Sequence, residues 1–196
     1  MQSFSWSEGL YTSQPRRIEL PEDDTEAVGS VLEYLYNDEY FPRRLGGNKD
    51  GALERDTSVA DPDDSGTALL RHARVYTLAS KFELPALKSL AHSKIHRTPS
   101  NARGEIAYAR YIYQETDPED VTIRRPVAAF WATRSHVLRH EAEAEFRSMC
   151  LEFPQFGFDV LNLVLDQKER KVEPVVLSQS ERGDRSARKR ARVSQV

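Results

Sequence analysis

Histidines are the side chains in this sequence best suited to chemistry, and four of them form two pairs at helical spacing. His92 and His96 are four residues apart, as are His136 and His140, and Glu141 follows the second pair. Two imidazoles at positions i and i+4 of a helix can bind a transition-metal ion. Neither pair forms the HExxH pattern, however, and no third ligand accompanies either pair. We therefore interpret both pairs as solvated helix surface and expect neither a metal nor another cofactor.

The chain has a single cysteine, Cys150, which excludes an intramolecular disulfide and fits a reducing compartment. Cys150 ends an apolar helical stretch with no evident base beside it, which favours a buried thiol over a nucleophile. The pair Gly46-Gly47 lies in a polar stretch without the strand-to-helix context of a phosphate-binding loop. Because no acid–base or nucleophile constellation results, we expect neither an enzyme nor a small-molecule substrate.

A basic cluster near the C-terminus is a sharper motif. It comprises Arg188, Lys189, Arg190 and Arg192. Such a cluster can act as a nuclear import signal or contact nucleic acid, and it can equally be part of a solvated tail. The preceding folded part is acidic to neutral and carries no motif of a nucleic-acid reader, so we do not expect nucleic acid as its partner.

Two helices joined at Leu84-Pro85 organise the centre of the chain, residues 66–97. In the first helix, apolar residues recur mostly three or four apart, which predicts one buried face. That face comprises Leu69, Leu70, Ala73, Tyr76, Leu78, Ala79 and Phe82. The polar face comprises Arg71, His72, Arg74, Ser80 and Lys81. Pro85 suits the first position of the second helix, where a missing N–H costs nothing. Neither helix can bury its apolar stripe alone, so we expect the pair to pack on a larger body.

A strand, a helix and a polar insertion are predicted before this pair. Residues 16–20 alternate in polarity and end at Pro21, which is typical of a strand. Asp23 or Asp24 then begins a helix. Its predicted buried face comprises Val28, Val31, Leu32, Leu35 and Tyr36. Residues 42–66 are rich in glycine and acidic residues and lack apolar periodicity, which predicts a disordered insertion.

Further amphipathic helices are predicted between residues 102 and 165. Pro126 should kink one of them or begin a new helix. In the last one, residues 156–165, we expect Phe158, Leu161 and Leu165 to face inward. The apolar signal fades after Lys168, and residues 169–196 have the composition of a disordered basic tail.

Length and charge set broad limits. The chain has 196 residues, is 39% hydrophobic and 30% charged, and carries a net charge of −3, which is too near neutral to indicate a class of partner. No apolar run approaches the length of a membrane span, and the N-terminus lacks a signal-peptide pattern. We expect an intracellular protein, cytoplasmic or nuclear, with no membrane partner.

Several motifs, taken in order, resemble a BTB/POZ domain of the fungal type. They are the WSEG turn at residues 6–9, the RRIELP strand, the helix ending YLYNDEY, and HARVYTLASKF at residues 72–82. The resemblance implies an α+β fold, mostly α, with a short strand and helical hairpins. It also implies a BTB-like domain at residues 1–97, a helical extension at 98–168 and the tail at 169–196. Because the chain begins almost at the WSEG turn, we expect a domain that lacks its N-terminal half, either by truncation or in a degenerate paralogue.

This resemblance implies a non-catalytic adaptor or scaffold that binds other proteins. Its partner would be either another BTB chain or a cullin-3-type scaffold of a ubiquitin ligase. Carried over to this sequence, the partner-binding residues would be Tyr36, Asp38, Glu39, Tyr40 and Tyr76. The alternative is a nuclear regulatory protein that uses its basic tail for import or nucleic-acid contact.

Overall fold

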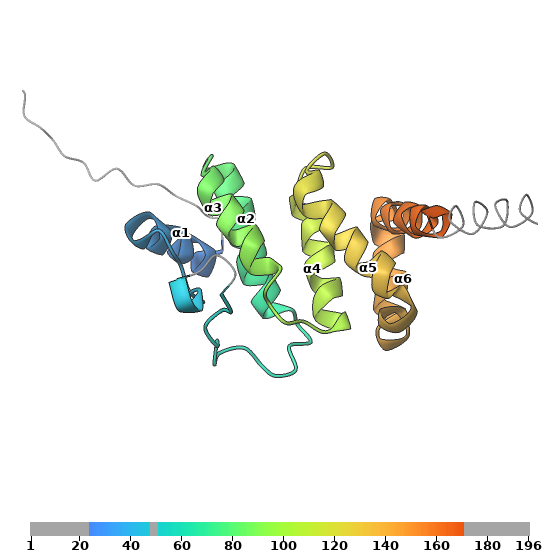
Figure 1. Ribbon diagram of the computed structural model, residues 1–196, viewed down its shortest axis with the longest axis horizontal. Helices are drawn as coiled ribbons and strands as arrows, with labels where there is room; N and C mark the ends of the chain where they lie inside the picture. The colour runs from blue at the N-terminus through green and yellow to red at the C-terminus, as the bar shows by residue number, and fades with distance from the viewer. Residues whose placement is uncertain (1–23, 48–50, 171–196) are drawn as a thin grey trace, which may run out of the picture.

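The computed structural model describes residues 24–47 and 51–170, and these residues are predominantly helical. The elements are α1 (Thr25–Asn37), η1 (Leu45–Gly47), α2 (Thr67–Lys81), α3 (Pro85–Ile95), α4 (Ala102–Glu115), α5 (Val121–Glu141) and α6 (Glu143–Glu152). Residues 154–170 are also helical. The helices follow the long axis of the molecule in approximate chain order, from α1 at one end to α6 and residues 154–170 at the other (Figure 1).

The predicted α+β fold class is wrong for the described part of the chain. Residues 24–47 and 51–170 contain no strand, and only an isolated bridge pairs Arg44 with Leu53. The strand predicted at residues 16–20 lies outside the described residues. The physical reason is that helical faces here bury one another directly, so the core requires no sheet.

The central pair forms as predicted, with α3 beginning at Pro85. α2 packs on α1, α3 and α4, and its buried residues include two that belong to different predicted faces, Tyr76 and His72. The prediction that His72 lies on the polar face is therefore wrong. α3 likewise buries an unpredicted charge, Lys94, beside the expected Leu87 and Ile95. α4, which was assigned to the helical extension, packs directly on α2.

At the N-terminal end, α1 buries only part of its predicted face: Val31 is buried and Val28 is partly buried against the core, whereas Leu32 is 52% exposed. Asp24 caps the helix, since its carboxylate accepts the N–H of Ala27 at 2.9 Å. Ala27 and Val31 are buried against the core. Leu35 and Tyr36, by contrast, are 57% and 88% exposed, so the prediction that they are buried is wrong.

A buried arginine connects α4 to α5. The Arg124 guanidinium donates to the carbonyl oxygens of Tyr113 and Thr116 at the end of α4. These carbonyls would otherwise lack helical partners. Pro126, two residues later, lies inside α5 without ending it. At the far end of the core, an aromatic cluster joins α5 to the helices after it: Trp131 of α5 stacks on Phe146 of α6 and is in edge contact with Phe156.

Residues 51–66, predicted as part of a disordered insertion, make specific contacts with α2 and α4. The carboxylate of Asp63 accepts the N–H groups of Thr67 and Ala68 at 3.0 and 2.9 Å and so caps α2. The chain then crosses α4 so closely that a Cβ atom on Gly66 would lie 2.6 Å from the carbonyl oxygen of Gly104. Residues 48–50 lie outside the described residues.

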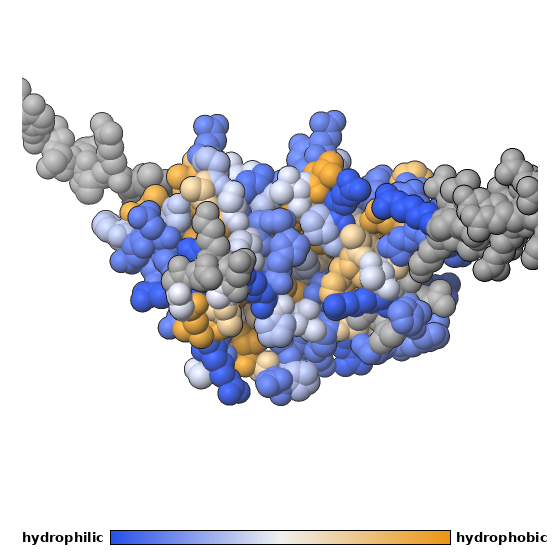
Figure 2. Space-filling model, in the orientation of Figure 1, coloured by the Kyte–Doolittle hydropathy of each residue, from blue (hydrophilic) through white to orange (hydrophobic). Residues whose placement is uncertain are grey.

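The molecular surface carries apolar side chains in separate patches, some of them near the two ends of the molecule (Figure 2). At the C-terminal end, Phe158, Leu161 and Leu165 are about half exposed, whereas Phe156 and Val160 are buried. The prediction that the former three face inward is therefore wrong. In the described part of the chain, no helix is both long and apolar enough to cross a membrane.

Candidate protein-interaction site

The end of α1 is the exposed part of the predicted partner-binding site. Tyr36 is 88% exposed, and Leu35 beside it is 57% exposed. Asp38 caps the helix in the left-handed conformation, with φ of 54°, and donates its N–H to the carbonyl oxygen of Tyr34 at 2.8 Å. This turn ends the helix and directs the following residues back toward the core.

Glu39 joins this turn to α3 through charged hydrogen bonds. Its carboxylate lies 2.6 Å from Nζ of Lys94, accepts from Nε of Arg44 at 2.8 Å, and accepts the N–H of Tyr40 at 3.1 Å. Partial burial raises the pKa of Glu39, but the hydrogen bonds from Lys94 and Arg44 outweigh burial and hold the pKa below its usual value. Glu39 is therefore ionised at neutral pH, and its role is to anchor the turn.

Tyr40 is fully buried beneath the turn rather than displayed on it. Its hydroxyl lies 3.0 Å from Nδ1 of His72, and its ring lies 3.7 Å from Nζ of Lys94. Burial first, and the charges of Lys94 and Arg71 second, lower the pKa of His72 to about 3, so this imidazole is neutral at physiological pH. Tyr40 thus supports the end of α1 from inside.

Tyr76, the fifth predicted residue, is buried in α2. Its hydroxyl donates to the Asp120 carboxylate at 2.9 Å, and Lys88 Nζ lies 2.9 Å from the same carboxylate. Burial, followed by the hydrogen bond to Asp120, raises the pKa of Tyr76. Four of the five predicted residues, Tyr36, Asp38, Glu39 and Tyr40, lie at the end of α1 and in the segment directly after it, with Tyr36 and Asp38 exposed and Tyr40 buried. The fifth, Tyr76, lies in a separate cluster with Asp120.

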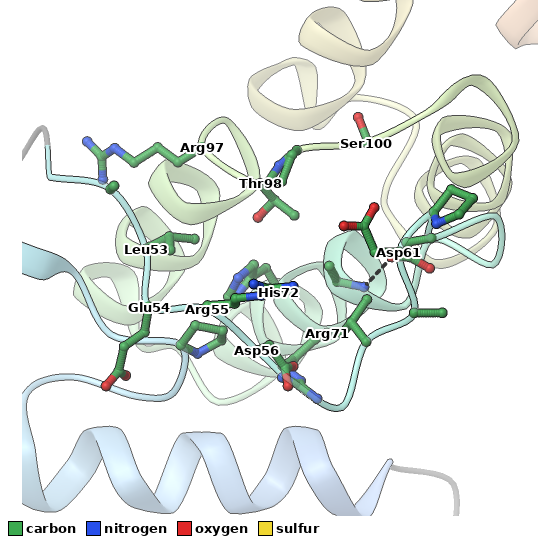
Figure 3. A pocket seen from close by; sticks show the side chains of 18 of the residues that line it. Leu53, Glu54, Arg55, Asp56, Asp61, Arg71, His72, Arg97, Thr98 and Ser100 are labelled. Carbon is green, nitrogen blue, oxygen red and sulfur yellow. Dashed lines mark hydrogen bonds and ion pairs between the residues drawn. The ribbon is translucent and has the colours of Figure 1, made fainter.

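A cavity of about 610 Å³ lies beside His72, the buried partner of Tyr40. It is bounded by residues 52–63, the start of α2 and the connection from α3 to α4. His72 and Arg71 of α2 lie on one side of it, Thr98 and Ser100 on another, and the insertion wraps around it (Figure 3). Arg71 is ion-paired with Asp56 across its wall. This cavity could not be predicted from the sequence, because most of its lining comes from the insertion that was predicted to be disordered.

The residues first considered for chemistry lie apart from this site. Nε2 of His92 lies 3.2 Å from Nε2 of His96 and 3.1 Å from the carbonyl oxygen of Thr122. His136 and His140 are exposed on α5. In the described ranges, no three histidine, cysteine or acidic side chains are placed to hold a metal ion together.

Cys150 and the basic cluster were the two remaining candidate sites in the sequence. Cys150 is half-buried, and burial raises the pKa of its thiol. A raised pKa makes the thiolate scarcer, so this cysteine is poorly suited to nucleophilic chemistry. The basic cluster at residues 188–192 lies outside the described residues.

No protein-family model, no curated protein and no solved structure matches this chain. The resemblance to BTB/POZ domains therefore rests on the sequence motifs alone.

Proposed function

We propose that this chain is a non-catalytic protein-interaction module that binds its partner through the exposed end of α1. The observation that carries the proposal is the exposure of Leu32, Leu35 and Tyr36, at 52%, 57% and 88%, on one helix. Exposed apolar side chains grouped on one element are typical of a protein-binding surface.

The chemistry of this surface suits protein recognition. Tyrosine is enriched at energetically important positions of interfaces because it combines a large apolar ring with a polar tip. Here Tyr36 and Leu35 would form the apolar centre, and Asp38 and Glu33 lie at its edge. Glu33 is paired with Arg43 at 2.7 Å, which gives the edge a charged, ordered rim.

The residues beneath this surface are held in place by buried interactions. Lys94 of α3 pairs with Glu39 and donates to the carbonyl oxygens of Tyr40 and Pro42, which ties the turn after α1 to α3. A preformed surface loses less conformational entropy on binding than a mobile one. Within the proposal, the BTB motifs favour two partner classes: a cullin-3-type scaffold and a second chain of the same type.

A binding assay with purified components tests this proposal. The full chain would be titrated against a cullin-3 homologue, and its own association would be measured by sedimentation. We expect Tyr36→Ala to weaken binding to the partner at least tenfold, since hot-spot tyrosines contribute upwards of about 1–2 kcal/mol. Leu161→Ala is the matched control, because Leu161 is also exposed but lies at the other end of the molecule.

The binding assay must distinguish a loss of surface contacts, as at Tyr36, from a loss of the buried residues beneath the surface, such as Tyr40. Tyr40→Ala would remove a fully buried ring and disturb the fold, so Tyr40→Phe is the informative change: it removes only the hydroxyl near His72. Equal affinities for the wild type and Tyr36→Ala, or no association with either partner class, would dispose of the proposal.

The alternative function, a nuclear regulatory protein, rests on the basic cluster of the sequence, Arg188, Lys189, Arg190 and Arg192. Replacing all four by alanine in a fluorescent fusion tests it. Loss of nuclear accumulation supports an import signal, and an unchanged distribution argues against it.

A further inference from the structure

His72 combines deep burial with a ring nitrogen that the protein leaves unpaired. The residue is 1% exposed, and its Nδ1 lies 3.0 Å from the hydroxyl of Tyr40. The other ring nitrogen, Nε2, has no hydrogen-bond partner in residues 24–47 and 51–170. Because buried polar groups are nearly always hydrogen-bonded, this nitrogen indicates a place for a partner from outside the chain.

The hydrogen bond to Tyr40 determines which nitrogen of His72 carries the proton. Tyr40 is fully buried, and among the described residues its hydroxyl contacts only Nδ1 of His72. If Nδ1 carried the proton, the hydroxyl would accept it and its own hydrogen would be buried without an acceptor. The hydroxyl therefore donates to Nδ1, and the neutral imidazole carries its proton on Nε2. Burial, followed by the charges of Lys94 and Arg71, lowers the pKa of His72 to about 3 and so keeps the ring neutral.

The Nε2 side of the ring faces the cavity of about 610 Å³. His72 lines this cavity whereas Tyr40 does not, so the ring edge away from Tyr40 is the one that reaches it. Residues 52–63 surround the imidazole on one side and residues 97–101 on another (Figure 3). A single buried N–H donor therefore points into a space large enough for a small molecule.

The walls of this cavity are mainly apolar. Side chains from separate segments of the chain contribute, among them Leu53, Val59, Ala68 and Pro99. Small-molecule sites typically have volumes of about 300–1,000 Å³, apolar walls and a few polar groups that orient the ligand. The cavity agrees with this description in both volume and lining.

Charges in the lining balance one another. The lining contains three arginines and four acidic residues. Arg71 is paired with Asp56, and the Asp63 carboxylate accepts two N–H groups at the start of α2. An anion would therefore meet no surplus of positive charge, and a cation would be repelled by the N–H dipole of His72. These features favour an uncharged ligand.

We infer that the cavity binds a neutral small molecule with an apolar body and a carbonyl oxygen, which accepts the Nε2–H of His72. The apolar body would contact the insertion, α2 and the connection from α3 to α4, and so hold these three segments together. This inference is independent of the proposed protein-interaction function, because the cavity and the exposed end of α1 are different surfaces.

NMR titration of the isotopically labelled full chain with three probes of similar size tests the inference. Acetophenone has the carbonyl acceptor, ethylbenzene lacks it, and benzoate is charged. All three are compared at the same concentrations, below the solubility of ethylbenzene, by the initial slopes of the shifts at Leu53, Thr98 and the His72 imidazole. We expect the acetophenone slopes to be about threefold to tenfold steeper than those of ethylbenzene, the range of one neutral hydrogen bond, and the benzoate slopes to be the smallest.

Two kinds of variant assign the binding to this cavity. Ala68→Leu fills the cavity from the second residue of α2, and Ala86→Leu is the matched control at the exposed second residue of α3. We expect the first to reduce the acetophenone slopes at least about fivefold and the second to leave them unchanged. His72→Asn keeps an acceptor for Tyr40 but removes the Nε2–H, so acetophenone should then bind no better than ethylbenzene. If this variant does not fold, the shift of the Nε2–H resonance in the wild type gives the same information.

Every other result contradicts the inference. Absence of shifts with all three probes would show that the cavity holds water only. Equal slopes for acetophenone and ethylbenzene would exclude recognition by His72, and the steepest slopes for benzoate would identify an anion site instead. An acetophenone titration that is unaffected by Ala68→Leu would place the probe outside the cavity.

Discussion

Nζ of Lys94 lies 2.6 Å from a carboxylate oxygen of Glu39, and the lysine side chain is fully buried. The same ammonium donates to the carbonyl oxygens of Tyr40 and Pro42. One buried charge from α3 therefore holds residues 39–42, the start of the segment that follows α1. Burial lowers the pKa of Lys94, although the Glu39 carboxylate opposes this effect by favouring the ammonium.

Replacing Lys94 by methionine should destabilise the protein by about 3–5 kcal/mol, because the Glu39 carboxylate and the two carbonyl oxygens lose the buried ammonium. Chemical denaturation at pH 7 measures this change. The matched control is Lys88→Met, whose ammonium pairs with Asp120 at 2.9 Å but is 30% exposed, so we expect a loss of about 1 kcal/mol or less. Equal losses for the two variants would show that the buried pair has no special role.

The pKa of His72 predicts a pH dependence of stability. The unfolded chain takes up a proton at His72 with an ordinary pKa of about 6.5, whereas the folded chain does so only at about 3. Stability from this group is therefore fully present above pH 6.5 and is lost as the pH falls toward 3. Between pH 7 and 5 the loss amounts to about 2 kcal/mol.

Denaturation curves at the two pH values of wild type and His72→Asn test this dependence. We expect the variant to be less stable at pH 7 but to lose less stability on acidification, since it has no proton to take up at this position. His140→Gln, a change at an exposed histidine, serves as the control and should keep the wild-type slope. An unchanged slope in His72→Asn would contradict the assignment.

The sequence predicted helix boundaries well where local backbone chemistry decides them. The start of α3 at Pro85 and the cap at Asp24 both follow from local backbone chemistry, which the sequence contains. The buried face of α2 was also largely predictable, because its apolar residues recur with one clear period.

Burial failed to follow from the sequence in two physical situations. α1 and residues 154–170 carry apolar residues on more than one face, so periodicity alone cannot say which face meets the core, and Leu35 and Leu161 were assigned to the wrong side. His72 and Lys94 were unpredictable for another reason. Their burial depends on partners about 30 and 55 residues away in sequence, Tyr40 and Glu39, and composition does not report such pairings.

Arg124 provides a test of the joint between α4 and α5. Its buried guanidinium donates to the last carbonyl groups of α4, so Arg124→Met leaves these groups without a donor. We expect a loss of about 1–3 kcal/mol in the free energy of unfolding. Arg125→Met is the neighbouring control, because Arg125 is exposed, and it should change stability by less than about 0.5 kcal/mol. Similar values for the two variants would argue against the capping role.

Among the glycines whose surroundings the structure describes, Gly66 should be the least tolerant of substitution. Its φ of 69° lies in the left-handed region, and a Cβ there would approach the backbone carbonyl of Gly104 to 2.6 Å. Because the obstructing atom belongs to backbone, neither side can give way without moving the start of α4. We expect Gly66→Ala to lower the free energy of unfolding by more than about 2 kcal/mol. Gly29→Ala is the control with the opposite sign: Gly29 lies in α1 beside open space, so alanine should stabilise the protein by about 0.5–1 kcal/mol. Thermal unfolding of both variants beside the wild type decides the matter, and a neutral Gly66→Ala would show that the crossing of residues 63–66 over α4 is looser than its geometry indicates.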